Sequence, residues 1–186
     1  MASMLTTAPD GAWTVEDLAA LPDDGLRYEL VDGALLVTPP PGPQHQIAAY
    51  RLAKVLEAAL PAQLRLMPGP VAVRTSAHRE LQPDLSVAPA SSVGPARLEG
   101  APPALVVEVL SRSTRSTDLV LKRALYEEMG IGSYWVLDPV VPSLRAWDLI
   151  DRRYIEVADV CGAQPYLAER PFPVRVVPTE LVPTVG

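Results

Sequence analysis

Two carboxylates occupy positions in this sequence where charge is costly. Glu108 lies inside the most apolar segment, residues 104–110 (ALVVEVL), and Asp84 follows Pro83 at the start of another short apolar segment. A glutamate inside such a strand is rarely fully buried unless another group pairs with it. Two carboxylates from neighbouring strands suit a hard cation such as Mg²⁺, with water and substrate phosphate as the other ligands. The pair therefore predicts metal-dependent chemistry on a phosphate.

Lys122 is the third residue that indicates chemistry. The chain has two lysines, Lys54 and Lys122, beside fourteen arginines, and Lys122 lies one turn into a helix predicted over residues 118–129. The pKa of a partly buried lysine shifts readily, so such a lysine can orient or deprotonate a water. Taken singly, Asp84 fits a turn, Glu108 a solvated edge and Lys122 the surface. Their combination favours a site.

The composition limits the class of protein. With 186 residues the chain fits one domain, and 16 basic against 22 acidic residues give a net charge of −6. That charge argues against a protein that coats nucleic acid or membrane by bulk attraction. It leaves room for a local site that binds phosphate through a metal, because the carboxylate ligands themselves lower the net charge.

Several function classes lose their usual sequence support. The chain contains no GxxxxGK[ST] loop, HExxH, CxxC, GxSxG or GxGxxG motif. Its one cysteine, Cys161, excludes an intramolecular disulfide and a thiolate metal cluster. We expect a cytoplasmic protein with no membrane partner, because its start lacks a secretory signal and no apolar run approaches the ~20 residues that span a bilayer.

The pattern of apolar residues and turn residues predicts a single α/β domain over residues 1–186, with a mixed β-sheet flanked by helices. Residues 1–12 are expected to be flexible, and residues 165–186 to form a proline-rich surface tail. An N-terminal hairpin is predicted around Asp32-Gly33, since such a pair between apolar runs is a strong hairpin signal. The predicted helices cover residues 14–20, 43–60 and 118–129, and the predicted strands cover 27–31, 34–37, 64–67, 71–75, 84–88, 104–110, 133–138, 143–149 and 153–158.

An ordered set of short motifs resembles a known family. The set runs through Arg27-Tyr28-Glu29-Leu30, His45-Gln46, Pro83-Asp84, Glu108-Val109-Leu110-Ser111, Asp118, Lys122, Tyr126 and Tyr134-Trp135-Val136. It is similar to a widespread bacterial family of restriction-endonuclease-like proteins in the PD-(D/E)XK nuclease superfamily. The resemblance covers about residues 13–180 and implies a restriction-endonuclease-like fold and a DNA substrate. It is compatible with a homodimer, since cutting both strands favours two sites.

The resemblance also implies roles for individual residues. Asp84 matches the aspartate of the PD element and Glu108 the second acidic ligand. The lysine usually found two residues later would be Leu110, and Lys122 on the following helix takes its place. Glu29 matches an early acidic residue that helps to hold the metal or its waters, although a glutamate on a hairpin strand also fits a position that faces solvent. The implied cofactor is Mg²⁺, with Mn²⁺ as a substitute, held by Asp84, Glu108, Glu29 and the carbonyl of Val109.

Three further residues are candidates for substrate binding. His45 near a helix start is either a packed, hydrogen-bonded histidine or a contact to the substrate phosphate. Ser111 and Arg112 lie between a strand and a helix, a place suited to phosphate oxygens, although loop hydroxyls there also satisfy the backbone. Tyr126 and Trp135 are expected to be core aromatics.

Three hypotheses for the function remain open at the level of sequence. The first is a Mg²⁺-dependent endonuclease that hydrolyses DNA phosphodiester bonds, with Asp84, Glu108, Lys122 and Glu29 as its catalytic residues. The second is a non-catalytic DNA- or protein-binding module on the same fold, favoured by the net charge and by Leu110. The third is hydrolysis of another phosphodiester.

Overall fold

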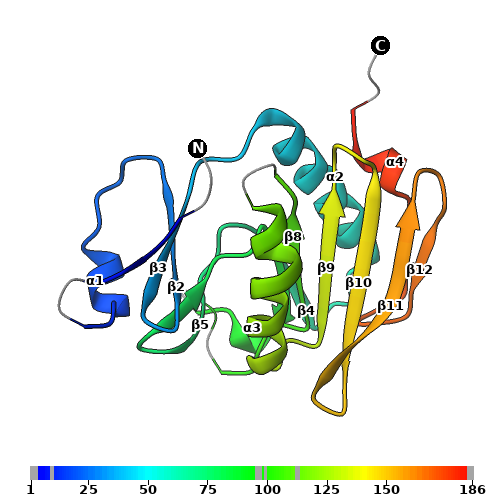
Figure 1. The fold of residues 1–186 in the computed structure, drawn as a ribbon. Helices are drawn as coiled ribbons and strands as arrows, with labels where there is room; N and C mark the ends of the chain where they lie inside the picture. Colours follow the sequence, from blue (N-terminus) through cyan, green and yellow to red (C-terminus); the bar gives the residue numbers. More distant parts are fainter. Residues whose placement is uncertain (1–3, 9–10, 95–97, 99, 112–113, 184–186) are drawn as a thin grey trace.

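The computed structural model describes residues 4–8, 11–94, 98, 100–111 and 114–183. Two β-sheets and two main helical segments make up most of the fold (Figure 1). The larger sheet has six strands in the order β11 (Arg153–Cys161), β10 (Ser143–Ile150), β9 (Ser133–Asp138), β8 (Leu105–Val109), β7 (Leu85–Pro89) and β4 (Leu64–Pro68). The second has five, in the order β1 (Met4–Thr7), β3 (Ala34–Thr38), β2 (Arg27–Val31), β6 (Arg79–Leu81) and β5 (Val73–Ser76).

The predicted hairpin and first helix are present at the N-terminal end. Strands β2 and β3 pair in antiparallel register, and Asp32 and Gly33 both have positive φ, as a two-residue hairpin turn requires. Helix α1 (Val15–Ala19) begins at Thr14, whose hydroxyl accepts from the N–H of Asp17 while the Asp17 carboxylate accepts from Thr14 in return. These local signals place β2, and Glu29 within it, in the second sheet.

Strand β8 forms the centre of the larger sheet and is buried on both faces. It pairs in parallel with β9 and antiparallel with β7. Helical residues Thr117–Lys122 (η2) and Arg123–Glu128 (α3) connect β8 to β9, which is the strand–helix–strand unit expected from the sequence. Figure 1 shows α3 on one side of this sheet and α2 (Pro43–Ala59) on the other.

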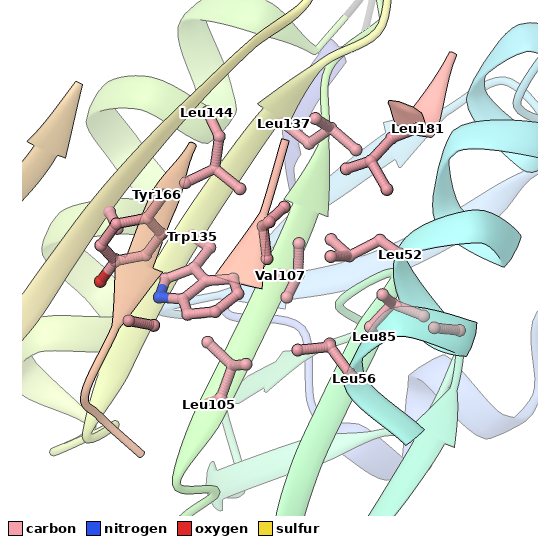
Figure 2. Close-up of a cluster of buried hydrophobic side chains, with 14 of the residues drawn as sticks. Leu52, Leu56, Leu85, Leu105, Val107, Trp135, Leu137, Leu144, Tyr166 and Leu181 are labelled. Carbon is pink, nitrogen blue, oxygen red and sulfur yellow. The ribbon is translucent and has the colours of Figure 1, made fainter. Parts of the chain in front are cut away.

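One face of the larger sheet packs against α2. Leu52 and Leu56 project from that helix onto Val107 and Trp135 of the sheet, and Figure 2 shows these side chains together. Alternation along β8 sends the neighbouring side chains, Glu108 among them, to the opposite face under η2 and α3. The mixed sheet with helices on both faces confirms the predicted fold class.

The helix after β8 differs from the predicted uniform α-helix over 118–129. Residues Thr117–Lys122 form a π-helical turn that runs directly into α3. Turns of this wider kind are rare in proteins, and those that do occur are frequently found at functional sites. Asp118 and Lys122 both lie on this turn and are both buried.

Other elements correct the predictions at the two ends of the chain. Met4–Thr7, expected to be flexible, pairs with β3 as strand β1. The segment from residue 165, expected to be a surface tail, forms β12 (Tyr166–Ala168), β13 (Val174–Val176) and α4 (Pro178–Leu181). Leu181 and Tyr166 are buried in the core of Figure 2, so this segment completes the α2 side of the protein.

Two smaller elements complete the description. Strand β6 had no predicted counterpart, and the short helical turn η1 covers Ala90–Ser92. Among the helices of the described residues, none combines the length and apolarity needed to cross a membrane.

Candidate active site

The Lys122 ammonium lies between carboxylates that come from different parts of the fold. Its Nζ is 2.9 Å from Glu29 Oε1, 2.9 Å from Glu108 Oε1 and 3.9 Å from Asp118 Oδ1. Glu29 comes from β2 in the second sheet, Glu108 from β8 in the larger sheet, and Lys122 from η2. All four side chains are buried, so the charges interact in a medium that screens them weakly.

Asp84, directly before β7, is bound by a second group of donors. Its Oδ1 accepts from Arg27 Nη2 at 3.0 Å, and its Oδ2 accepts from the N–H of Val109 at 2.8 Å and lies 3.0 Å from His45 Nε2. Pro83 precedes it, and the Gly69 N–H donates to the Asp84 carbonyl at 2.7 Å. The backbone and the ion pair together fix the direction of this carboxylate.

The two groups meet around one small cavity of about 20 Å³. A cavity needs roughly 10–15 Å³ to hold one water molecule, so this one has room for a single water or ion. Its lining includes four acidic residues, Glu29, Asp84, Glu108 and Asp118, and two arginine or lysine residues, Arg27 and Lys122, together with His45, Val109, Ser111 and Thr114. Its four carboxyl groups outnumber the side chains of Arg27 and Lys122, so acidic groups predominate among these described residues.

Burial and neighbouring charges shift the pKa values of this cluster in opposite directions. Burial raises the pKa of Glu108 well above its ordinary value despite the nearby ammonium, and burial raises the pKa of Asp118 to about 6. Burial also raises the pKa of Asp84, but the hydrogen bond and charge of His45 and the charge of Arg27 outweigh it and lower that pKa to about 2.

Lys122 keeps its proton in this arrangement. Burial lowers the pKa of its ammonium, but the Glu108, Glu29 and Asp118 carboxylates outweigh burial and raise the pKa above the ordinary lysine value. In this arrangement the group can therefore orient a ligand or stabilise negative charge.

The cavity offers donor atoms of the kind that a divalent cation binds. Glu29 Oε2 and Asp118 Oδ1 are buried oxygens without a hydrogen-bond partner among the described residues. Carboxylate oxygens are the donors that Mg²⁺ prefers. In the described part of the chain, no three His, Cys, Asp or Glu side chains are already grouped for a metal. The carboxylates face Lys122 and Arg27 instead.

The remaining predicted site residues have different surroundings. His45 is buried and hydrogen-bonded, as in the first of the two roles considered for it from the sequence. Its ring also lines the cavity. Val109 contacts Asp84 through its N–H, and a role for its carbonyl stays a prediction. The Ser111 hydroxyl lies 3.1 Å from that of Thr114 and lines the cavity. Arg112 lies outside the described residues.

Sequence reasoning missed several residues that shape the site. Arg27, quoted only as part of a motif, binds Asp84, and Tyr126, expected to be a core aromatic, donates its hydroxyl to Glu108 Oε1 at 2.8 Å. Asp118, also quoted only as part of the motif set, had a usable signal, since it lies four positions before Lys122 on one helix. Gly69 had no signal in the sequence. A Cβ at this position would lie 2.3 Å from the Pro83 carbonyl oxygen, and only the tertiary structure shows this close approach.

The arrangement of the sheets and helices defines a class of protein. A crystal structure titled "a putative nuclease belonging to DUF820 from Anabaena variabilis ATCC 29413" matches with a TM-score of 0.69 over 90% of this chain and 96% of that chain. The two sequences are 16% identical, so this likeness shows the fold, which is restriction-endonuclease-like. A comparison with curated proteins gives no match.

The family follows from the sequence itself. Residues 15–178 match the profile of the family Uma2, which is described as "Putative restriction endonuclease". The match spans most of the chain, from α1 to the start of α4. The chain therefore belongs to this family, in agreement with the resemblance carried by the motifs around Asp84, Glu108 and Lys122.

Proposed function

We propose that this protein is a Mg²⁺-dependent endonuclease that hydrolyses phosphodiester bonds in DNA. The observation that carries the proposal is the small cavity where Glu29, Asp84, Glu108 and Asp118 meet a buried lysine, with more acidic than basic side chains in its lining. Membership of a restriction endonuclease family supports the same chemistry and makes DNA the expected substrate.

Each residue of the cluster has a role that its contacts support. Asp84, Glu108 and Glu29 would hold the cation, with the carbonyl of Val109 as a further ligand. When bound, Mg²⁺ would polarise the phosphoryl group and lower the pKa of a bound water. Lys122, kept protonated by its carboxylate neighbours, would place a positive charge where the phosphate gains negative charge.

Arg27 and Tyr126 would keep the ligands in place. Arg27 binds Asp84 from one side of the cavity, and Tyr126 donates to Glu108 from the core. Ligands fixed in this way lose little freedom when a cation and a phosphate bind, which is how a preorganised site lowers a barrier. Mn²⁺ would take the same oxygen ligands as Mg²⁺.

Cleavage assays with matched variants test this proposal. The purified protein should cut DNA with Mg²⁺ or Mn²⁺ and lose that activity in Glu108→Gln and Lys122→Met. Lys54→Met is the matched control, because Lys54 is the other lysine in the chain and is exposed on α2. If no DNA substrate is cut with either metal, or if Lys122→Met cuts as fast as Lys54→Met, the proposal is wrong.

A non-catalytic binding module is the second candidate, and one observation favours it. The carboxylates of the described residues face cationic side chains and are not grouped for a metal, and Leu110 replaces the usual lysine. Calorimetric titration with Mn²⁺ separates the two candidates. A nuclease site should bind Mn²⁺ and lose that binding in Glu108→Gln, whereas the module would bind no metal at this position.

Hydrolysis of a non-nucleotide phosphodiester, the third hypothesis from the sequence, has no specific feature of the structure in its favour. Product analysis on nucleotide and non-nucleotide substrates would distinguish it from DNA cleavage.

A further inference from the structure

A larger hollow opens beside the small acidic cavity. This cleft has a volume of about 440 Å³, and its walls include Leu18 and Leu21 around the end of α1, Leu26 and Tyr28 at the start of β2, and Gln46 on α2. The volume falls within the ~300–1,000 Å³ range of sites that bind small organic groups. The cleft is therefore large enough for one planar group of a substrate.

The cleft and the cavity share a wall. Arg27, Pro41, His45 and Asp84 line both of them. In a nucleic acid each phosphate is attached through a sugar to a base, so a phosphate at the small cavity has its neighbouring base within reach of the cleft. The shared wall connects the proposed site of chemistry to a place for that base.

Charge in the cleft does not favour a phosphate backbone as its occupant. Its acidic lining residues, Asp23 and Asp84, are balanced only by Arg27 and, when protonated, His45. Proteins that bind duplex DNA through its backbone gain affinity from several lysine or arginine contacts to phosphates. This chain carries a net charge of −6, so its affinity for a strand must come largely from another source.

The walls of the cleft provide apolar surface with a few polar groups, and this surface can supply the affinity for a strand. Unstacked bases bind against apolar and aromatic side chains, and polar side chains contact their edges. Tyr28 and the leucines supply the apolar part, and Gln46 and Gln82 supply amides. His45 is buried, its Nε2 faces Asp84, and its Nδ1 has no hydrogen-bond partner among the described residues.

We propose that this cleft binds one unstacked base next to the phosphate that reaches the acidic cavity. The preferred substrate is then single-stranded or locally unpaired DNA, since a paired base is held in its duplex. This inference rests on the proposed function for its choice of substrate, but it is tested by binding and needs no cleavage.

Fluorescence anisotropy of short labelled strands tests the proposal directly. The wild-type protein, in Ca²⁺ to avoid cleavage, should bind a single strand more tightly than a duplex of the same sequence. A strand of equal length and charge that lacks its bases should bind about tenfold or more weakly, because stacking contributes about 1–3 kcal/mol per base. Equal affinity for the strands with and without bases, or preference for the duplex, would overturn the proposal.

Two substitutions on the same helix locate the base. Gln46→Trp fills the cleft from an exposed position on α2, and Gln44→Trp places the same side chain at an exposed position outside the cleft lining. Gln46→Trp should weaken binding of the single strand about tenfold, with Gln44→Trp unchanged. Equal effects of the two substitutions would overturn the assignment to the cleft.

The outcomes separate this inference from the proposed function. Selective binding of single strands that Gln46→Trp weakens supports the cleft even if the protein cuts no DNA. Metal-dependent cleavage that treats single strands and duplexes alike and ignores Gln46→Trp supports the nuclease and overturns the base-binding cleft.

Discussion

Replacing Lys122 by methionine removes the one ammonium that contacts three buried carboxylates. Its Nζ is 2.9 Å from both Glu29 and Glu108 and 3.9 Å from Asp118, and the side chain is 3% exposed. Removing one partner of a buried ion pair costs about 3–5 kcal/mol, because the remaining charge stays buried without compensation. Against a total stability of roughly 5–15 kcal/mol for a domain, this is a large loss.

The loss should depend on pH in a defined direction. Burial already raises the pKa of Glu108 and Asp118, and without the ammonium the largest influence that opposes this rise is lost. Groups with a folded pKa above the unfolded value bind more protons when folded, so stability falls as pH rises through that interval. The deficit of Lys122→Met relative to the wild type should therefore be small near pH 5 and grow towards pH 8.

Urea unfolding at several pH values measures this deficit. Lys54→Met is the control, because Lys54 is exposed and an exposed substitution usually changes stability by within about 0.5 kcal/mol. The double variant Glu108→Gln with Lys122→Met should lose less than the sum of the two single variants, since it removes both members of the pair. The reasoning is refuted if Lys122→Met is as stable as Lys54→Met, or if its deficit shrinks as pH rises.

Three further predictions address the frame of the site. Leu181→Ala should cost about 2–5 kcal/mol in urea unfolding, because Leu181 is buried in the core against α2. Asp84→Asn should lower stability by about 2 kcal/mol at pH 7. His45 and Arg27 outweigh the effect of burial and hold the Asp84 pKa near 2. The difference in stability between the wild type and Asp84→Asn should therefore disappear as pH falls from about 4 to 2. Gly69→Ala should displace the backbone before β7 and weaken Mn²⁺ binding in calorimetry.

Each of these predictions has a matched control. Leu167→Ala, at an exposed position of β12, should leave stability nearly unchanged, and an equal loss would contradict the buried role of the C-terminal segment. Asp159→Asn, on an exposed carboxylate, should show no such pH-dependent difference. Gly42→Ala, with open space around a new Cβ, should leave Mn²⁺ binding intact, and an effect equal to that of Gly69→Ala would refute the steric argument.

Elements of both sheets could be predicted where their signals are local. The valine-rich run around Glu108 predicts a strand buried on both faces, and the Asp32-Gly33 pair predicts the hairpin turn that its positive φ values bear out. The C-terminal segment was misjudged for the opposite reason. Its prolines interrupt the alternation that reveals a strand, so nothing local indicated that Tyr166 and Leu181 enter the core.

By itself, the sequence determined the candidates for the chemistry. Charge inside an apolar strand is costly, so Glu108 stood out, and the scarcity of lysine made Lys122 conspicuous. Asp84 stood out because it follows a proline at the start of a strand. The ordered motifs added Glu29 and indicated the family, and these inferences need only residue types and their order.

Only the tertiary structure decided which charges meet. Arg27 binds Asp84 across 57 positions of sequence, and Lys122 joins Glu29 of one sheet to Glu108 of the other. Contacts of this kind depend on how separate elements pack, which local patterns do not encode. The same packing surrounds Lys122 with carboxylates, which raises the pKa of its ammonium above the ordinary lysine value.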